Sequence, residues 1–143
     1  EFPLNIRTEG FRFSKATELD FDEELEGAES AEFKLVTDNG FPFTVRMQLY
    51  FLDEAGAILD SLYTEGLAPV IAAATFNAGG IATTPTQQIS VAEIAGDRLE
   101  DIRDRIQQVR VTGELLTPGD GATFVRIYDH YELTIKLGVL AGF

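Results

Sequence analysis

The sequence contains no cysteine, no tryptophan and only one histidine. Without cysteine the chain cannot form a disulfide, a thiolate metal site or a thiol nucleophile. A single histidine excludes zinc sites and facial triads that need two histidines from one chain. His130 does stand beside Asp129, but neighbouring residues of a strand point to opposite faces, and no Gly-x-Ser-x-Gly motif accompanies them. We therefore expect a protein that is not an enzyme.

Basic residues are also scarce. The chain has 11 lysines and arginines against 24 aspartates and glutamates, a formal net charge of −13. A surface of this sign repels phosphate backbones and anionic lipids, which argues against nucleic acid as a partner. No apolar run approaches the ~18 residues that a membrane span needs, so we expect no membrane insertion by this segment. Residues 1–5 lack a basic stretch of signal-peptide type, and we interpret residues 1–143 as one domain, the mature form or C-terminal part of a longer precursor.

What the sequence does contain is alternation of apolar and polar residues, the pattern of strands with one buried face. The clearest run is Phe43 to Phe51, and the turn residues Asp53 to Gly56 connect it to a returning strand at 58–63. Alternation at 31–37, followed by the turn residues Asp38 to Gly40, predicts a second hairpin leading into Phe43. Further strands are expected at 2–6, 11–13, 70–76, 87–94, 110–116, 123–127 and 131–139.

Only residues 97–109 have the periodicity of a helix, with Leu99, Ile102, Ile106 and Val109 on one stripe. Asp97 has the character of an N-cap, with a glutamate three residues later as in a capping box. Strands about ten residues apart with a single helical interruption favour two packed antiparallel sheets over a parallel α/β fold. The predicted fold class is mainly β, a two-sheet antiparallel β-sandwich with one short α-helix at about 97–109.

One acidic segment could hold a cation. Between Glu18 and Glu29 there are seven acidic residues and no basic one. Calcium requires six to eight converging oxygens, and of the EF-hand spacing only the alternation Asp20, Asp22, Glu24 is present. A solvated acidic loop, or an edge strand protected by like charges, is the alternative reading. We therefore expect no cofactor, with calcium at Asp20, Asp22 and Glu24 as the alternative.

Aromatic side chains and a flexible loop offer another binding surface. Most aromatics fall at inward positions of the expected strands, where core packing explains them. Tyr50 should lie on the face opposite Phe51, and together with Tyr63 it could form a surface for carbohydrate. The loop at 77–86 contains Gly79-Gly80 without the spacing or lysine of a phosphate-binding loop, so nucleotide binding is not expected.

Three stretches, 38–43, 48–62 and 131–143, resemble the C-terminal β domain of large cell-surface proteins of Bacteroidota, and the strand followed by an aspartate–glycine turn is similar to late-embryogenesis-abundant β-sandwiches. The resemblance implies an extracellular, cell-surface location and a β-sandwich architecture. It transfers no catalytic residue. Phe143 would be a natural C-terminus.

These observations leave two classes of function. The first is a structural module of the cell surface, such as a filament subunit, whose terminal strands pair with a neighbouring subunit or domain by strand addition. The residues expected to carry that assembly are Phe2, Leu4, Ile6, Leu133, Ile135, Leu137 and Val139. The second is an extracellular module that binds carbohydrate, calcium or a protein partner.

Overall fold

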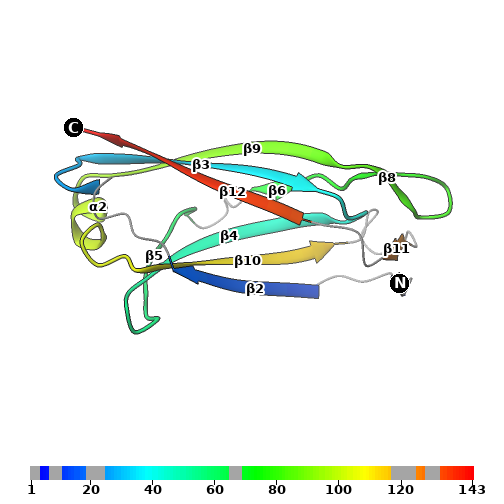
Figure 1. Ribbon diagram of the computed structural model, residues 1–143, viewed down its shortest axis with the longest axis horizontal. Helices are drawn as coiled ribbons and strands as arrows, with labels where there is room; N and C mark the ends of the chain where they lie inside the picture. The colour runs from blue at the N-terminus through cyan, green and yellow to red at the C-terminus, as the bar shows by residue number, and fades with distance from the viewer. Residues whose placement is uncertain (1–3, 7–10, 19–24, 65–68, 117–124, 128–132) are drawn as a thin grey trace.

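A computed structural model of the chain describes residues 4–6, 11–18, 25–64, 69–116, 125–127 and 133–143 (Figure 1). One helix, α2 (Asp97–Ile102), interrupts a series of strands. In chain order the strands are β1 (Leu4–Ile6), β2 (Phe11–Glu18), β3 (Ser30–Asn39), β4 (Thr44–Leu52), β5 (Ile58–Ser61), β6 (Val70–Ile71), β7 (Thr75–Phe76), β8 (Ala82–Thr84), β9 (Thr86–Ala95), β10 (Gln108–Leu116), β11 (Val125–Ile127) and β12 (Leu133–Gly142).

The strands form two main antiparallel sheets, which confirms the predicted fold class. The five-stranded sheet has the order β2-β10-β4-β5, with β6 pairing β4 on the same edge as β5. The three-stranded sheet has the order β12-β3-β9. Two small pairs, β1-β11 and β7-β8, stand apart from the main sheets in the pairing scheme. The strands run along the long axis of the molecule, and α2 lies at the same end as the C-terminus (Figure 1).

The core lies between the two sheets and follows the alternation of the sequence. Phe43 and the inward residues of β4 are all buried, as are Ala31, Phe33, Leu35 and Thr37 of β3. The rings of Phe33 and Phe51 meet across the sandwich with centroids 5.0 Å apart, a tilted arrangement that aromatic pairs favour. The period-2 pattern therefore predicts correctly which face of β3 and of β4 is buried, whereas on β9 the apolar Ile89 and Val91 are exposed.

The hairpin predicted after Phe51 is present. β4 and β5 pair antiparallel, with a register shift between Phe51 and Leu52. Both Ala55 and Ala57 donate backbone hydrogen bonds to the Asp53 carboxylate, and Gly56 adopts a φ of 84° that favours glycine. Aspartate and glycine thus play the turn roles expected of them.

The second predicted hairpin is wrong. β3 and β4 do not pair; they belong to different sheets, and residues 40–43 carry the chain across the core. Asn39 organises this crossover from a fully buried position. Its side-chain amide donates to the carbonyls of Phe43 (2.8 Å) and Ala72 (3.1 Å), and its oxygen accepts from the Phe41 N–H (3.0 Å). Residues 38–40 do have turn chemistry, but at this point the chain passes from one sheet to the other and does not reverse into a hairpin.

Two further expectations need correction. The helix ends at Ile102, not at 109, because the chain turns at 103–105 and β10 begins at Gln108. Ile106 and Val109 remain buried, so their apolar character reflects the core and not one continuous helix. Asp97 is the first helical residue; the N-cap is Gly96, with no side-chain capping hydrogen bond. The strand expected at 70–76 is divided into β6, which pairs with β4, and β7, which pairs with β8.

Candidate assembly edge

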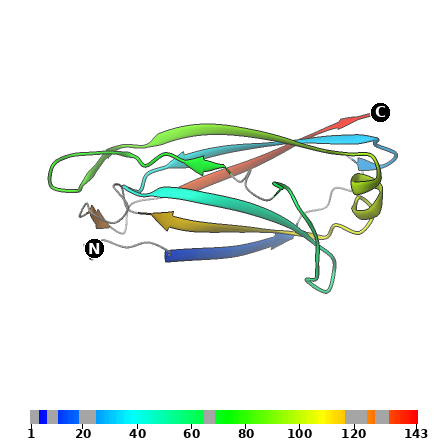
Figure 2. The ribbon, with the colours of Figure 1, turned by 180° about the vertical axis from the view of Figure 1, so that it is seen from behind.

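β12 forms one edge of the three-stranded sheet. It pairs with β3 over its whole length, from Leu133↔Asn39 to Gly142↔Ser30. Within the described residues, no second strand pairs with β12. Figure 1 shows β12 in red on the near side of the sandwich, and in Figure 2, seen from behind, it lies on the far side. A strand of ten residues with one neighbour presents a row of peptide groups on its other side.

The register shows which peptide groups face that free side. The Gly96 N–H donates to the Glu29 carbonyl, one step beyond the pair Ser30↔Ala95, so this is the hydrogen-bonded type of pair. Because the two types alternate along an antiparallel ladder, the odd-numbered residues of β3 bond to β9 and the even-numbered residues bond to β12. By the same alternation, β12 bonds to β3 through its even-numbered residues. Its odd-numbered residues direct their N–H and C=O groups toward the free edge.

Four residues predicted to carry assembly lie on this edge: Leu133, Ile135, Leu137 and Val139 are partly buried and pack against the core. Their side chains point inward, while their peptide groups point to the free side. The opposite face of β12 is exposed and carries Thr134, Lys136, Gly138 and Leu140. Lys136 is the only charged residue of the strand. An edge with one charge in ten residues is weakly protected against pairing.

The other predicted assembly residues lie elsewhere. Leu4 and Ile6 belong to β1, whose partner is β11 through the pairs Leu4↔Ile127 and Ile6↔Val125. Phe2 lies outside the described residues. The two groups of assembly residues, from β1 and from β12, therefore belong to different sheets.

On the opposite side of the sandwich, side chains near the start of β9 join the two sheets. Gln88 of β9 donates to the Val70 carbonyl (2.9 Å) and accepts from the Ala72 N–H (3.2 Å), which joins β9 to the β6 segment. Thr86 adds a bond from its hydroxyl to the Ala73 carbonyl (2.8 Å). Since β6 lies on the β5 edge of the other sheet, that edge adjoins β9. The two remaining edges, β12 and β2, consequently lie on the same side of the sandwich.

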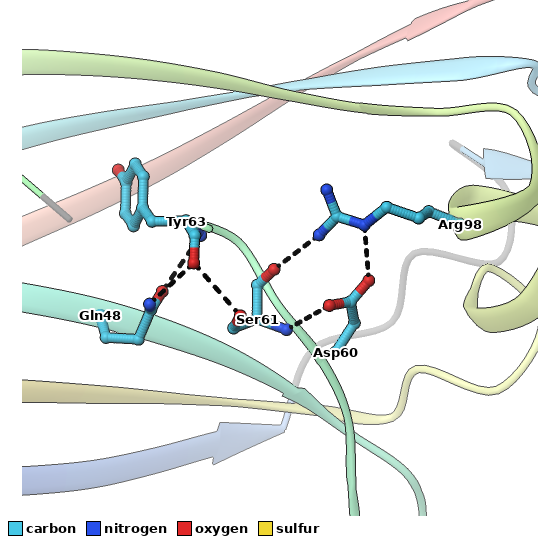
Figure 3. Close-up of polar contacts among 5 residues, drawn as sticks. All are labelled: Gln48, Asp60, Ser61, Tyr63 and Arg98. Atoms are coloured by element: carbon cyan, nitrogen blue, oxygen red, sulfur yellow. Dashed lines mark hydrogen bonds and ion pairs between the residues drawn. The ribbon is translucent and has the colours of Figure 1, made fainter. Parts of the chain in front are cut away.

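A second polar cluster joins β5 to β4 and α2 (Figure 3). The Gln48 side chain donates to the Tyr63 carbonyl (2.9 Å) and accepts from the Tyr63 N–H (3.1 Å), as a paired strand would. Arg98 donates to the Asp60 carboxylate (3.0 Å) and to the Ser61 carbonyl (3.0 Å). These polar groups are occupied by backbone and by each other, so the cluster is architectural.

Tyr63 is buried at 6% exposure, and its hydroxyl has no hydrogen-bond partner. Burial raises the pKa of Tyr63 to about 12. In Figure 3 the ring points into the space between the sheets, away from Gln48. The predicted carbohydrate surface built from Tyr50 and Tyr63 is therefore wrong, because only Tyr50 is accessible to a ligand, and only in part.

The calcium hypothesis falls on residues outside the described part: Asp20, Asp22 and Glu24, as does His130. In the part that the structure describes, no group of three or more histidine or carboxylate side chains could hold a metal ion. The loop predicted at 77–86 is a loop only in its first half, the β7–β8 connection, where Asn77 accepts hydrogen bonds from the N–H groups of Gly79 and Ile81; β8 occupies most of the second half. None of the described helices is long and apolar enough to cross a membrane.

Sequence reasoning missed three side chains that bond to the backbone of other segments: Asn39, Gln48 and Gln88. Each satisfies a backbone donor and a backbone acceptor, and the two glutamines substitute for a neighbouring strand. A glutamine on an alternating strand reads as an ordinary polar position, and nothing local marks it. Only Asn39 carried a signal, because it interrupts an otherwise apolar inward series at a predicted turn.

Comparison with known proteins gives the fold. No family model matches the sequence, and a search of curated proteins gives no significant match. A predicted secreted protein of Parabacteroides distasonis, a member of the Bacteroidota, is similar in structure, with a TM-score of 0.61 and 15% identity over 92% of this chain and 38% of that chain. VP2 of infectious bursal disease virus, in a subviral particle, has a TM-score of 0.51 and 11% identity over 99% of this chain and 30% of that chain.

The structure of the Gx strain of that virus is similar to the same degree, with a TM-score of 0.51 and 10% identity. The match covers 96% of this chain and 28% of that chain. This chain thus spans less than two-fifths of the length of each of these proteins. At such identities the likeness establishes the β-sandwich fold.

Proposed function

We propose that this chain is a non-enzymatic structural module of a bacterial cell-surface assembly, joined to its neighbours by strand addition at β12. The observation that carries the proposal is the edge of β12, which has no second partner strand among the described residues, is ten residues long with a single charge, and has odd-numbered peptide groups facing outward. Backbone groups of this kind bind an added strand without a dedicated pocket. The partner is another copy of the chain or a neighbouring domain of the same assembly.

Three observations support different parts of this proposal. The polar side chains with defined contacts are used for architecture: Gln48, Asn39 and Gln88 bond to backbone, and Arg98 bonds to Asp60 and Ser61. Assembly through β12 needs no such group. The structural neighbour from a Bacteroidota species is a predicted secreted protein, which supports an extracellular location. VP2, with the same fold, occurs in a subviral particle.

The test is the state of association of the purified chain across a concentration series, measured by sedimentation velocity and electron microscopy. The matched pair of variants is Ala141→Pro and Ala95→Pro, each at the end of an edge strand in the same sheet. By the alternation above, both residues direct their N–H away from β3, so proline removes no ladder hydrogen bond in either case.

Ala141→Pro blocks an added strand at β12, so we expect association to weaken while the melting temperature stays close to that of the parent chain. Ala95→Pro changes the β9 edge and leaves the β12 edge intact, so it should leave association through β12 unchanged. A chain that stays monomeric at every concentration would refute the proposal and direct attention to the alternative, a module that binds calcium, carbohydrate or a protein partner. Equal effects of the two prolines would refute the role of β12.

A further inference from the structure

We infer that the occupant of the β12 edge is the β12 strand of a second copy, paired antiparallel about a two-fold axis at Gly138. This inference rests on the proposed function and names its partner. The outcome is a closed pair of chains with a continuous six-stranded sheet. A filament would need a second joining surface, such as the β2 edge of the other sheet, in addition to β12.

The direction of the peptide groups restricts the pairing. Outward N–H and C=O groups belong to odd-numbered residues, so an odd residue of one copy must face an odd residue of the other. The sum of two paired residue numbers is then even. A sum of 274 places Leu137 on the axis, and a sum of 276 places Gly138 there. A sum of 272 would set Lys136 opposite Lys136, and like charges directly opposite each other are unfavourable.

The register centred on Gly138 brings the whole of β12 into the pairing. It pairs Leu133 with Phe143, Thr134 with Gly142, Ile135 with Ala141, Lys136 with Leu140, Leu137 with Val139, and Gly138 with its own copy. The pairing extends through every residue from Leu133 to the last residue of the chain. No charge faces a like charge, although the chain as a whole carries −13. The sole charged residue, Lys136, faces a leucine.

This register also covers the two most exposed large apolar side chains. Leu140 is 68% exposed and Phe143 is 80% exposed. In the pair, Leu140 packs against the aliphatic stem of Lys136 of the second copy, and Phe143 packs on Leu133. The inward residues of β12, half-buried at the edge, gain a neighbour on their open side. Ile89 and Val91 of β9 are exposed as well, at 55% and 54%, but Leu140 and Phe143 are the more exposed, and both would be covered in this pair.

Glycine on the axis has a physical reason as well. Even-numbered residues form the close type of antiparallel pair, with Cα atoms about 4.5 Å apart. A Cβ added at Gly138 would meet only the Lys34 carbonyl oxygen at 3.9 Å within its own chain, an ordinary contact. Side chains introduced at this position are therefore tolerated by the single chain. Such side chains should instead change the affinity between two copies of the chain.

The first experiment is disulfide trapping, which the absence of cysteine makes clean. A pair of Gly138→Cys residues facing each other at about 4.5 Å lies within the range that a disulfide spans. We expect Gly138→Cys to give a covalent dimer on mild oxidation at concentrations where Lys136→Cys does not. Lys136→Cys is the matched control, exposed on the same face of the strand but facing Leu140 of the second copy.

The second experiment uses charge, with association measured by sedimentation equilibrium. Gly138→Glu faces Lys34 across the β3 ladder and should keep or raise the melting temperature of the single chain. In the pair it sets Glu opposite Glu, and we expect at least a tenfold weaker association. Gly138→Lys should weaken association similarly. Thr134→Lys adds the same charge to the same face, opposite Asp38 in its own chain and Gly142 in the pair, and should leave association unchanged.

The outcomes separate the inference from the proposed function. Association that is strengthened by Gly138→Glu would overturn the axis at Gly138 in favour of Leu137, where residue 138 faces Lys136. Association that ignores all Gly138 variants but is lost in Ala141→Pro would overturn the two-fold pairing while strand addition at β12 stands. No association of the parent chain under any condition would overturn both.

Discussion

Replacing Asn39 by alanine should destabilise the fold more than any other single polar substitution among the contacts described above. Asn39 is 0% exposed and makes three hydrogen bonds. Two of them tie the crossover at 40–43 to itself, through Phe41 and Phe43. The third binds the segment that follows β6, through Ala72. One side chain thus connects the crossover at 40–43 to the segment that follows β6.

The magnitude follows from these three bonds. A hydrogen bond contributes about 0.5–1.5 kcal/mol net, and a buried group left without a partner costs about 1–3 kcal/mol. The bond to Phe43 is buried, whereas those to Ala72 and Phe41 are partly buried and open to replacement by water. We expect Asn39→Ala to lower the free energy of unfolding by about 3 kcal/mol, a large part of the 5–15 kcal/mol typical of a domain.

Urea denaturation measures this change. With a slope of about 2 kcal/mol per molar, a loss of 3 kcal/mol lowers the midpoint by about 1.5 M. Asn39→Asp provides a matched variant of almost the same shape. Its carboxylate can accept from the Phe41 N–H but cannot donate to the carbonyls of Phe43 and Ala72, so burial beside those oxygens raises its pKa above the ordinary value.

A carboxyl group whose pKa is raised in the folded state stabilises the fold less as the pH rises through that pKa. The deficit of Asn39→Asp relative to the parent chain should therefore be smaller at about pH 4 than at pH 7. If Asn39→Ala leaves the midpoint unchanged, or if the deficit of Asn39→Asp does not depend on pH, the crossover is not held by this amide and the reasoning is refuted.

Other substitutions test other layers of the structure. Tyr63→Phe removes a buried hydroxyl that has no partner and should raise the free energy of unfolding by about 1 kcal/mol. Because the pKa of Tyr63 is raised to about 12 in the folded state, the parent chain should lose stability as the pH rises from about 10 toward 12, and Tyr63→Phe should lose less, as measured by chemical denaturation at each pH. Phe33→Ala, at the ring contact with Phe51, should cost about 3–5 kcal/mol, and Phe33→Leu clearly less; equal losses would contradict a packing role. Gln88→Val removes both bonds between β9 and the β6 segment, and should cost about 1–2 kcal/mol and open the β9 edge, so that irreversible aggregation on heating increases; unchanged aggregation would show that Gln88 does not protect that edge.

The local sequence pattern predicts the buried faces of β3 and β4 correctly. Alternation of apolar and polar residues in 31–37 and 43–51 gives the buried face of β3 and β4 without error, because a strand in a sandwich has one wet side and one dry side. The β4–β5 hairpin follows in the same way, since Asp53 and Gly56 act within five residues of each other. Such features depend on neighbours in the sequence alone.

The same pattern fails where a distant partner decides. Residues 38–42 have turn chemistry in either case, but whether β3 reverses onto β4 or crosses to another sheet depends on β12 and β9, which pair with β3 from more than forty residues away. Helical periodicity at 97–109 has the same ambiguity. Ile106 and Val109 are apolar because the core needs them, and the periodicity extends beyond the six residues that are helical.

For the candidate site, sequence alone named the inward residues of β12, because their alternation at the end of the chain is strong. It could not show that β12 is an edge strand, which of its peptide groups face outward, or that Gln88 joins β9 to the β6 segment. Strand order and register are properties of residues brought together from across the chain, since the hydrogen bonds that fix them join segments with no local signal in common. The sequence determined the alternating faces, the turns and the acidic charge; the tertiary structure decided which edge stays open.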